Sequence, residues 1–239
     1  MNQLPSPIAA GDYQIDPSGV SLADGAKLRS PIVGAARLVQ PTGGPVAGML
    51  HGGVGVLMQG FRAEMAPRSP NLQGAPINGV TDLTCIDMDV SGIWDNFYNL
   101  KGNSLVSTSH LKTCYDSFRN GHGAVITVND TIFTHGVPAQ GYIRYCYADY
   151  DGHYIFNRCV FVCTLAPTDL TTKINALIAN SDPLIDPTSS GPSIIELNDC
   201  IIAATQGITQ LRQNGSGRII VRRTQYNKLA YMGNVEQGI

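Results

Sequence analysis

Residues 126–133 read Ile-Thr-Val-Asn-Asp-Thr-Ile-Phe, and residues 154–161 repeat the pattern as Tyr-Ile-Phe-Asn-Arg-Cys-Val-Phe. Further copies follow at residues 195–202 and 219–226. In each copy two apolar residues alternate with other residues, a polar residue breaks the alternation, and a small and then an apolar residue resume it. Because residues two apart in a strand share one face, the pattern predicts two short strands joined by a sharp turn.

The polar residue between the two strands marks a corner of the chain, and asparagine tolerates the left-handed conformation that such a bend requires. We place seven corners, three of them in less regular segments, at Gln59, Ile86, Ser109, Asn129, Asn157, Asn198 and Arg222. Their spacing is 20 to 28 residues, with one interval of 41. A repeat of this length is typical of a solenoid, in which each coil buries its face only by stacking on its neighbours. The chain is therefore predicted to be all-β, a parallel β-helix of about seven coils.

The chain divides into three predicted parts. Residues 1–50 contain six prolines and no sustained periodicity, which indicates an extended N-terminal arm and a cap. The coils occupy residues 51–230, and residues 231–239 form a closing tail. Insertions at residues 66–78 and 166–192 interrupt the coils.

The second insertion is predicted to contain a short helix. Thr168 and Asp169 precede apolar residues at helical spacing, which are Leu170, Ile174, Leu177 and Ile178. Such a helix covers its own coil or docks a neighbour.

Composition narrows the function classes. Charged residues make up 14% of the chain, the net charge is −2, and there is no run rich in lysine and arginine, so neither a nucleic-acid nor an anionic-membrane partner is expected. Residues 1–14 lack the features of a signal peptide, and we expect synthesis in the cytoplasm. Cys85, Cys159 and Cys200 occupy inward positions, which predicts reduced thiols stacked in the core. No metal site or cofactor is predicted, because the five histidines lie singly.

Acidic residues raise the question of catalysis. Asp87 and Asp89 flank the inward Met88 and are predicted to point outward together. A column of charges directly follows four corners, at Asp130, Arg158, Asp199 and Arg223. Glycoside hydrolysis needs two carboxyl groups about 5 to 10 Å apart, which neighbouring coils supply. We favour a self-neutralising ladder over a catalytic pair for this column.

The densest run of tyrosines lies in residues 142–154. Its candidate binding residues are Tyr142, Tyr145, Tyr147, Asp149, Tyr150 and Asp151. The first interpretation is a saccharide platform, because sugar rings stack on aromatic rings. The second is a protein interface, in which tyrosine is favoured. The third interpretation is an ordinary strand and turn with alternate tyrosines half-buried.

The repeats Ile-x-Val-Asn-Asp-Thr-Ile-Phe, Tyr-Ile-Phe-Asn-Arg-Cys-Val-Phe and Ile-Glu-Leu-Asn-Asp-Cys-Ile-Ile resemble the right-handed parallel β-helix superfamily. Its members include pectate-lyase-like enzymes, bacteriophage tailspikes and virion decoration proteins. The resemblance extends from about Val54 to Ala230, implies a right-handed solenoid, and transfers no catalytic residue. Enzymes of the superfamily usually have a longer solenoid and an acid, lysine or arginine cluster, whereas this chain has only five lysines.

Together these features predict a bacteriophage structural protein rather than an enzyme, namely a capsid decoration protein or a spike. The arm would attach to the capsid, and we expect a homo-oligomer, in the first instance a trimer, located in the virion. The alternative is a carbohydrate-binding or polysaccharide-cleaving spike domain that uses residues 142–154 or the acidic face, with a glycan as its partner.

Overall fold

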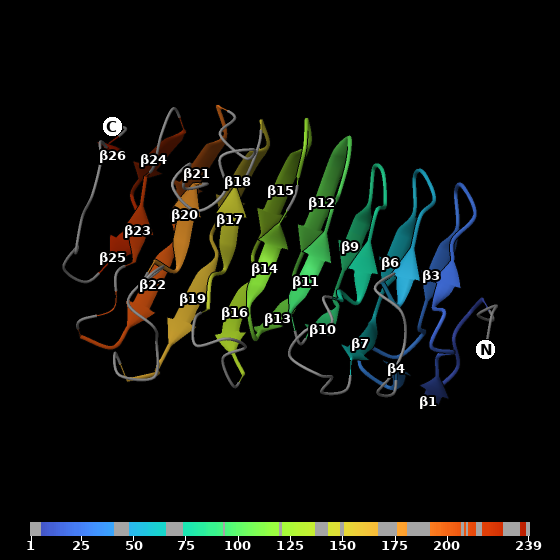
Figure 1. Ribbon diagram of the computed structural model, residues 1–239. Coiled ribbons are helices and arrows are strands. Elements are labelled where there is room, and N and C mark those ends of the chain that lie inside the picture. Colours follow the sequence, from blue (N-terminus) through green and yellow to red (C-terminus); the bar gives the residue numbers. More distant parts are fainter. Residues whose placement is uncertain are drawn as a thin grey trace.

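The computed structural model describes residues 6–40, 48–65, 74–92, 94–119, 121–136, 143–148, 151–166, 176–180, 192–206, 208, 210–213, 217–226 and 235–237. Every helix or strand assigned among them is a β-strand, and all paired strands are parallel. The chain is a parallel β-helix, as the sequence predicts. Figure 1 shows the coils stacked along one axis, with the N- and C-terminal labels at opposite ends.

Each coil passes through three sheets in the order III, I, II. Sheet I has nine strands: β1 (Gly11–Gln14), β4 (Ala36–Gln40), β7 (Phe61–Met65), β10 (Asp89–Ser91), β13 (His110–Thr113), β16 (Ile132–His135), β19 (Val160–Cys163), β22 (Ile201–Ala204) and β25 (Gln225–Tyr226). Sheet II has five strands: β2 (Val20–Ser21), β5 (Leu50–His51), β8 (Ile77–Asn78), β11 (Asp95–Tyr98) and β14 (Asp116–Arg119).

Sheet II continues along the same side of the stack as sheet IV, because Asp116 forms a parallel bridge with Arg144. Sheet IV has three strands: β17 (Cys146–Ala148), β20 (Ile178–Asn180) and β23 (Leu211–Arg212). Sheet III has nine strands: β3 (Lys27–Arg29), β6 (Leu57–Gln59), β9 (Thr84–Ile86), β12 (Asn103–Ser107), β15 (Val125–Asn129), β18 (His153–Asn157), β21 (Ile194–Asn198), β24 (Arg218–Arg222) and β26 (Val235–Gln237).

The alternation in the repeats places one face of sheets I and III in the core. In the clearest coil Ile126, Val128, Thr131 and Phe133 are all buried, which confirms the predicted inward positions. Equivalent aromatic residues stack from coil to coil, and the ring centroids of Phe133 and Phe161 lie 4.5 Å apart. Burial of each such side chain contributes about 1.5–3 kcal/mol, so the stacked rows stabilise the solenoid along its whole length.

The corners between sheets III and I lie one residue away from their predicted positions. The left-handed conformation falls on Asp130, Arg158 and Asp199 rather than on the asparagines that precede them. Asn157 instead donates a hydrogen bond of 2.8 Å from Nδ2 to Oδ1 of Asn129, and Asn198 repeats this bond to Asn157 at 3.0 Å. Asparagine recurs at this position because its amide bonds to the equivalent amide of the next coil.

One of the less regular segments was placed in the wrong register. The predicted corner at Ser109 is corrected to Thr108, whose φ of 46° is left-handed, and Ser109 is buried. The strand pairing aligns Val106 with Cys85 and Val128, which fixes the register.

The predicted small stacked thiols are confirmed. Cys85, Cys159 and Cys200 are buried, and all six cysteines are free thiols. Burial raises the pKa of the Cys159 thiol well above its ordinary value. Cys159 and Cys200 fill the small position that Thr131 fills in its coil, whereas Cys85 lies in register with Val106 and Val128.

Two structural boundaries differ from the predicted ones. The predicted arm of residues 1–50 is corrected, because β1, β2 and β3 pair with β4, β5 and β6 and so form a coil of their own. The predicted helix is corrected at its end: Ile178 lies in β20, where it pairs with Cys146 and Leu211. Leu170 and Ile174 lie outside the described residues. At the other end of the stack β26 pairs with β24, within the predicted tail.

Among the residues that the structure describes, no helix is long and apolar enough to cross a membrane.

Candidate active site

The tyrosine-rich run does not form an exposed platform in the part of it that the structure describes. Tyr145 is buried in the core with its ring centroid 5.7 Å from that of Phe133, and its hydroxyl donates to the carbonyl of Val162. Tyr147 is buried as well. The predicted role of both residues as direct sugar contacts is corrected, because a buried ring has no free face on which a sugar can stack. Tyr142, Asp149 and Tyr150 lie outside the described residues.

Asp151 is exposed and makes local contacts. Its carboxylate accepts hydrogen bonds from the imidazole of His122 and, at 2.7 Å, from the amide of Gly123. The bond to His122 is the main reason that the pKa of Asp151 lies below its ordinary value. Asp151 thus fixes the turn at Gly123, and its role in ligand binding stays a prediction.

The predicted charge column is confirmed as a ladder of ion pairs. Arg158 donates two hydrogen bonds of 2.7 Å to Asp130, and Arg223 donates bonds of 2.6 and 2.8 Å to Asp199. These bonds lower the pKa of both carboxyl groups. Because each carboxylate is held on both oxygens by its guanidinium, the column is a poor source of a catalytic acid.

A second charged column, absent from the sequence-based predictions, crosses sheets II and IV. The strand register aligns Asp95 of β11 with Asp116 of β14, and the bridge to Arg144 extends the column by one coil. Adjacent parallel strands are separated by about 4.8 Å, so the two carboxylates stand on neighbouring rungs. Arg144 donates hydrogen bonds of 2.6 Å to each oxygen of Asp116.

This column is buried, unlike the ladder of Asp130 and Arg158. Asp116 is 0% and Arg144 2% exposed, and Asp95 is also buried. Burial opposes the charge on Arg144, yet the attraction of Asp116 and its hydrogen bonds prevail and raise the pKa of Arg144. A buried ion pair costs desolvation energy that an apolar pair avoids, so its presence requires a structural or a functional explanation.

Aromatic rings surround the column. The guanidinium carbon of Arg144 lies 3.6 Å from the ring centroid of Tyr147, in a cation–π contact. Trp94 and Tyr115 precede the two aspartates, and their ring centroids are 4.4 Å apart. Burial first, and then the charge of Asp116, raise the pKa of Tyr115 to about 12. The rings keep water away from the carboxylates, which strengthens every charge interaction inside.

Three nitrogen atoms beside the column have no hydrogen-bond acceptor among the described residues. They are Nε1 of Trp94 and the Nε and Nη1 atoms of Arg119. Arg119 is 20% exposed in its side chain, and its Nε lies 4.0 Å from Asp116. Unsatisfied buried donors cost free energy. They are therefore candidate donors to the oxygen atoms of a ligand.

One sequence signal pointed to this column. Trp94-Asp95-Asn96-Phe97 and Tyr115-Asp116-Ser117-Phe118 share the order aromatic, aspartate, polar, phenylalanine at an interval of 21 residues. Phe97 and Phe118 are buried and stacked at 5.0 Å, which holds the aspartates in register. A search for repeats on the third side of the coil would have found this pair.

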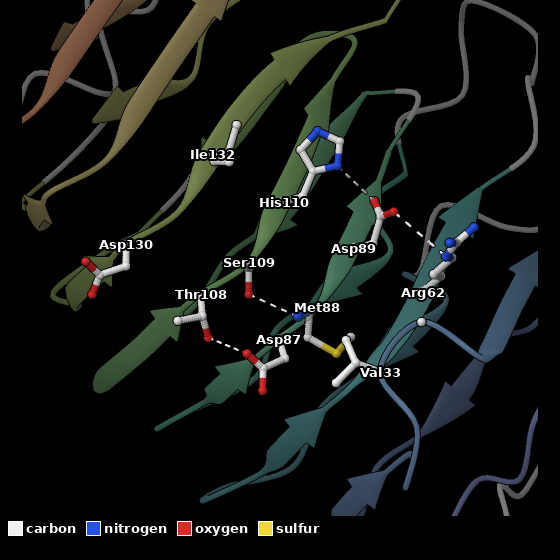
Figure 2. A pocket seen from close by; sticks show the side chains of 11 residues that line it. Val33, Arg62, Asp87, Met88, Asp89, Thr108, Ser109, His110, Asp130 and Ile132 are labelled. Atoms are coloured by element: carbon white, nitrogen blue, oxygen red, sulfur yellow. Dashed lines mark hydrogen bonds and ion pairs between the residues drawn. The ribbon is translucent and has the colours of Figure 1, made fainter.

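Asp87 and Asp89 lie on a different side of the solenoid, on and beside sheet I. Both line an open groove with Arg62, His110 and Asp130 (Figure 2). Their predicted outward direction is confirmed. No group of three or more His, Cys, Asp and Glu side chains in the described ranges is arranged to hold a metal ion.

No family model matches the chain, and no curated protein matches it. Two solved structures are similar, both of the pectin methylesterase from Aspergillus niger, one deglycosylated and one with an N-acetylglucosamine stub. They have TM-scores of 0.48 and 0.47 and 14% identity, and each match spans 95% of this chain and 71% of the other. The likeness is one of fold. Both matched structures are enzymes, so the expectation that this chain is not an enzyme is corrected.

Proposed function

We propose that this chain is a carbohydrate-active hydrolase whose reacting groups are Asp116 and Asp95. The observation that carries the proposal is the buried column in which two carboxylates stand in register one rung apart, next to the Arg144 guanidinium. Buried carboxylates beside a fixed cation are the arrangement by which enzymes assign separate roles to two acids.

Asp116 suits the role of nucleophile. Its two hydrogen bonds from Arg144 fix the direction of both oxygens. An oriented carboxylate attacks an electrophilic carbon and forms a covalent intermediate, which is an ester when the substrate is a glycoside and an acid anhydride when it is an ester.

Asp95 suits the role of general acid and then base. It stands on the next rung, about 5 Å along the stack, which is the carboxyl separation of double-displacement glycosidases. In the first step Asp95 gives its proton to the leaving oxygen while Asp116 bonds to carbon. In the second step Asp95 takes a proton from water, the water oxygen bonds to the same carbon, and the bond between that carbon and Asp116 breaks. The sum is hydrolysis with no other co-reactant.

The surroundings supply binding groups for a carbohydrate. The unsatisfied N–H groups of Trp94 and Arg119 can donate to substrate oxygens, and the rings of Trp94 and Tyr115, which are buried, exclude water rather than stack on a sugar. The same donors suit an acyl oxygen that gains charge during ester hydrolysis. Glycosidic and ester bonds of a polysaccharide are both within the chemistry of the site.

The experiment is a hydrolysis assay of the full chain on neutral and methyl-esterified polysaccharides. Because the matched structures are pectin methylesterases, methyl-esterified pectin belongs in the panel. New reducing ends report glycosidic cleavage, and released methanol reports ester cleavage. Asp116→Ala is expected to lower either rate by at least a thousandfold, and Asp95→Asn by at least a hundredfold. Absence of both products, or an Asp116→Ala protein with full activity, would overturn the proposal.

A structural role for Asp116 is separated from a catalytic one by chemical rescue. Added azide is expected to restore part of the turnover of Asp116→Ala, because the small anion replaces the missing nucleophile. The double variant Asp116→Ala/Arg144→Met controls for the uncompensated charge that the single variant leaves. A carboxylate that only stabilises the fold is not replaced by azide.

The predicted virion location, the capsid partner and the trimer stay predictions. Nothing in the comparisons favours a virion protein. A structural role in a particle is compatible with the hydrolase, since a spike can also act on a glycan.

A further inference from the structure

A groove of about 550 Å³ lies outside the core along sheet I and its corners. Arg62, Asp89 and His110 contribute from successive strands β7, β10 and β13. Asp87 and Thr108 contribute from the corners between sheets III and I. Figure 2 shows these side chains, with Asp130 and Ile132 at the left of the view and Arg62 at the right. The volume is in the range of small-molecule sites, and the groove is on a different sheet from the proposed catalytic column.

The floor of the groove is held in a costly conformation. Thr108 has a φ of 46°, which is rare for a β-branched residue, and its hydroxyl donates to Asp87 at 2.6 Å. Ser109 accepts a hydrogen bond of 3.2 Å from the amide of Met88, below the groove. The same left-handed conformation recurs at the equivalent corners Asp130 and Asp199, so it belongs to the coil, and the feature particular to the groove is the bond from Thr108 to Asp87. The bond from Thr108 fixes the position of the Asp87 carboxylate.

The charges of the groove do not cancel. Asp89 lies 3.4 Å from Nδ1 of His110 and 4.0 Å from Nε of Arg62, and the bond to His110 is the main cause of its lowered pKa. Asp130 is paired with Arg158. Asp87 has no cationic partner within the described ranges of the chain. The groove therefore has an excess of negative charge that is centred on Asp87.

Two aliphatic side chains border the same opening. Val33 and Ile132 are 65% and 48% exposed, which is high for large apolar residues. Such side chains pack against the C–H face of a sugar ring. The groove thus combines an apolar rim, the hydrogen-bond donors of Arg62, and an uncompensated carboxylate, whereas both ring nitrogens of His110 already contact Asp89 and Thr134.

We propose that this groove is a second saccharide-binding site, and that it takes an amine-bearing sugar unit whose ammonium group contacts Asp87. The proposal rests on the carbohydrate-active function and adds a substrate class to it. Asp89 and Arg62 bind the hydroxyl groups of the ring, and Val33 and Ile132 contact its C–H face. A uronate is disfavoured, because its carboxylate would face Asp87 and Asp89.

Binding is measured by isothermal titration calorimetry of the full chain with three probes: a glucosamine tetrasaccharide, cellotetraose and tetragalacturonate. The glucosamine probe is expected to bind tightest and tetragalacturonate at least tenfold more weakly. Asp87→Asn is expected to weaken binding of the glucosamine probe at least tenfold. Asp199→Asn is the matched control, since it also removes a corner aspartate but outside the groove, and it is expected to leave affinity unchanged.

Equal affinity for tetragalacturonate, or unchanged affinity in Asp87→Asn, would overturn the second site. Failure here is distinguishable from failure of the proposed hydrolase. Asp116→Ala is expected to keep the calorimetric signal of the groove while it loses turnover. Asp87→Asn is expected to keep turnover of a short substrate and to lose only binding of the tetrasaccharide.

Discussion

Arg144 donates two hydrogen bonds of 2.6 Å to the carboxylate of Asp116, and Arg158 donates two of 2.7 Å to the carboxylate of Asp130. The geometry is the same, but the first pair is buried and the second is exposed. Water screens the exposed pair and offers its members other partners. The buried pair has neither screening nor alternatives, so removal of one member leaves an uncompensated charge.

Arg144→Met is therefore expected to destabilise the protein by about 3–5 kcal/mol, as is usual when one member of a buried pair is removed. Urea denaturation followed by circular dichroism measures the change. Arg158→Met removes the same bidentate contact at the surface and is the control, with little expected effect. Equal effects of the two substitutions would mean that burial does not set the value of the pair.

The asparagine ladder predicts a graded loss. Asn157 makes two ladder bonds, one to Asn129 and one from Asn198, whereas Asn129 makes one. With each bond contributing about 1 kcal/mol, Asn157→Ala is expected to cost about twice as much as Asn129→Ala. Urea midpoints of the two variants test this. Equal losses would contradict an additive ladder.

Substitution of two glycines measures the cost of backbone strain apart from the cost of steric crowding. Gly60 and Gly55 both have left-handed φ, of 77° and 66°. A Cβ at Gly60 meets the carbonyl oxygen of Ser30 at 2.9 Å, whereas a Cβ at Gly55 meets nothing within 4 Å. Gly55→Ala is expected to cost about 1–2 kcal/mol from conformation alone, and Gly60→Ala more. Thermal melts of both variants give the difference, and a smaller cost at Gly60 would contradict it.

Sheets I and III were predictable because their strands alternate strictly. One face of each is buried, so the side chains of Ile126, Val128 and Phe133 carry a period-two signal, and neighbouring coils repeat it. The error of one residue at the corners arose because Asn129 is selected for its bond to Asn157. The left-handed position itself accepts Asp, Arg, Thr or Gly.

The candidate site was less predictable, because the strands of sheet II do not alternate. Asp95, Asn96 and Phe97 are consecutive and all buried, so no period-two pattern separates the core from the outer face. Arg144 lies 28 residues beyond Asp116 and joins it through an isolated bridge. Only the strand register brings the two together, and local sequence does not contain that information. The prediction of a binding platform in the tyrosine run was wrong for another reason. Composition indicates what Tyr145 can bind, but it does not indicate whether the side chain points inward or outward.

The exposed side of sheet III predicts a pH dependence. Glu196 accepts hydrogen bonds from Nε2 of His153, at 2.9 Å, and from Arg222. Partial burial raises the pKa of Glu196, but the bonds from Arg222 and then His153 outweigh it, so the pKa lies below its ordinary 4.5. A carboxyl group whose pKa is lowered by folding stabilises the folded state above its unfolded pKa, and the stabilisation disappears as the pH falls through the folded value.

The melting temperature of the wild type is accordingly expected to exceed that of Glu196→Gln at pH 7, and the gap to narrow steadily below about pH 4.5. Because the site is largely solvated, the gap at pH 7 is expected to be a few degrees at most. Asp151→Asn, at another carboxylate whose pKa is lowered by a histidine neighbour, His122, is expected to show a gap that narrows in the same direction. A gap for Glu196→Gln that stays constant down to pH 3 would show that packing of this side chain, and not its charge, stabilises sheet III.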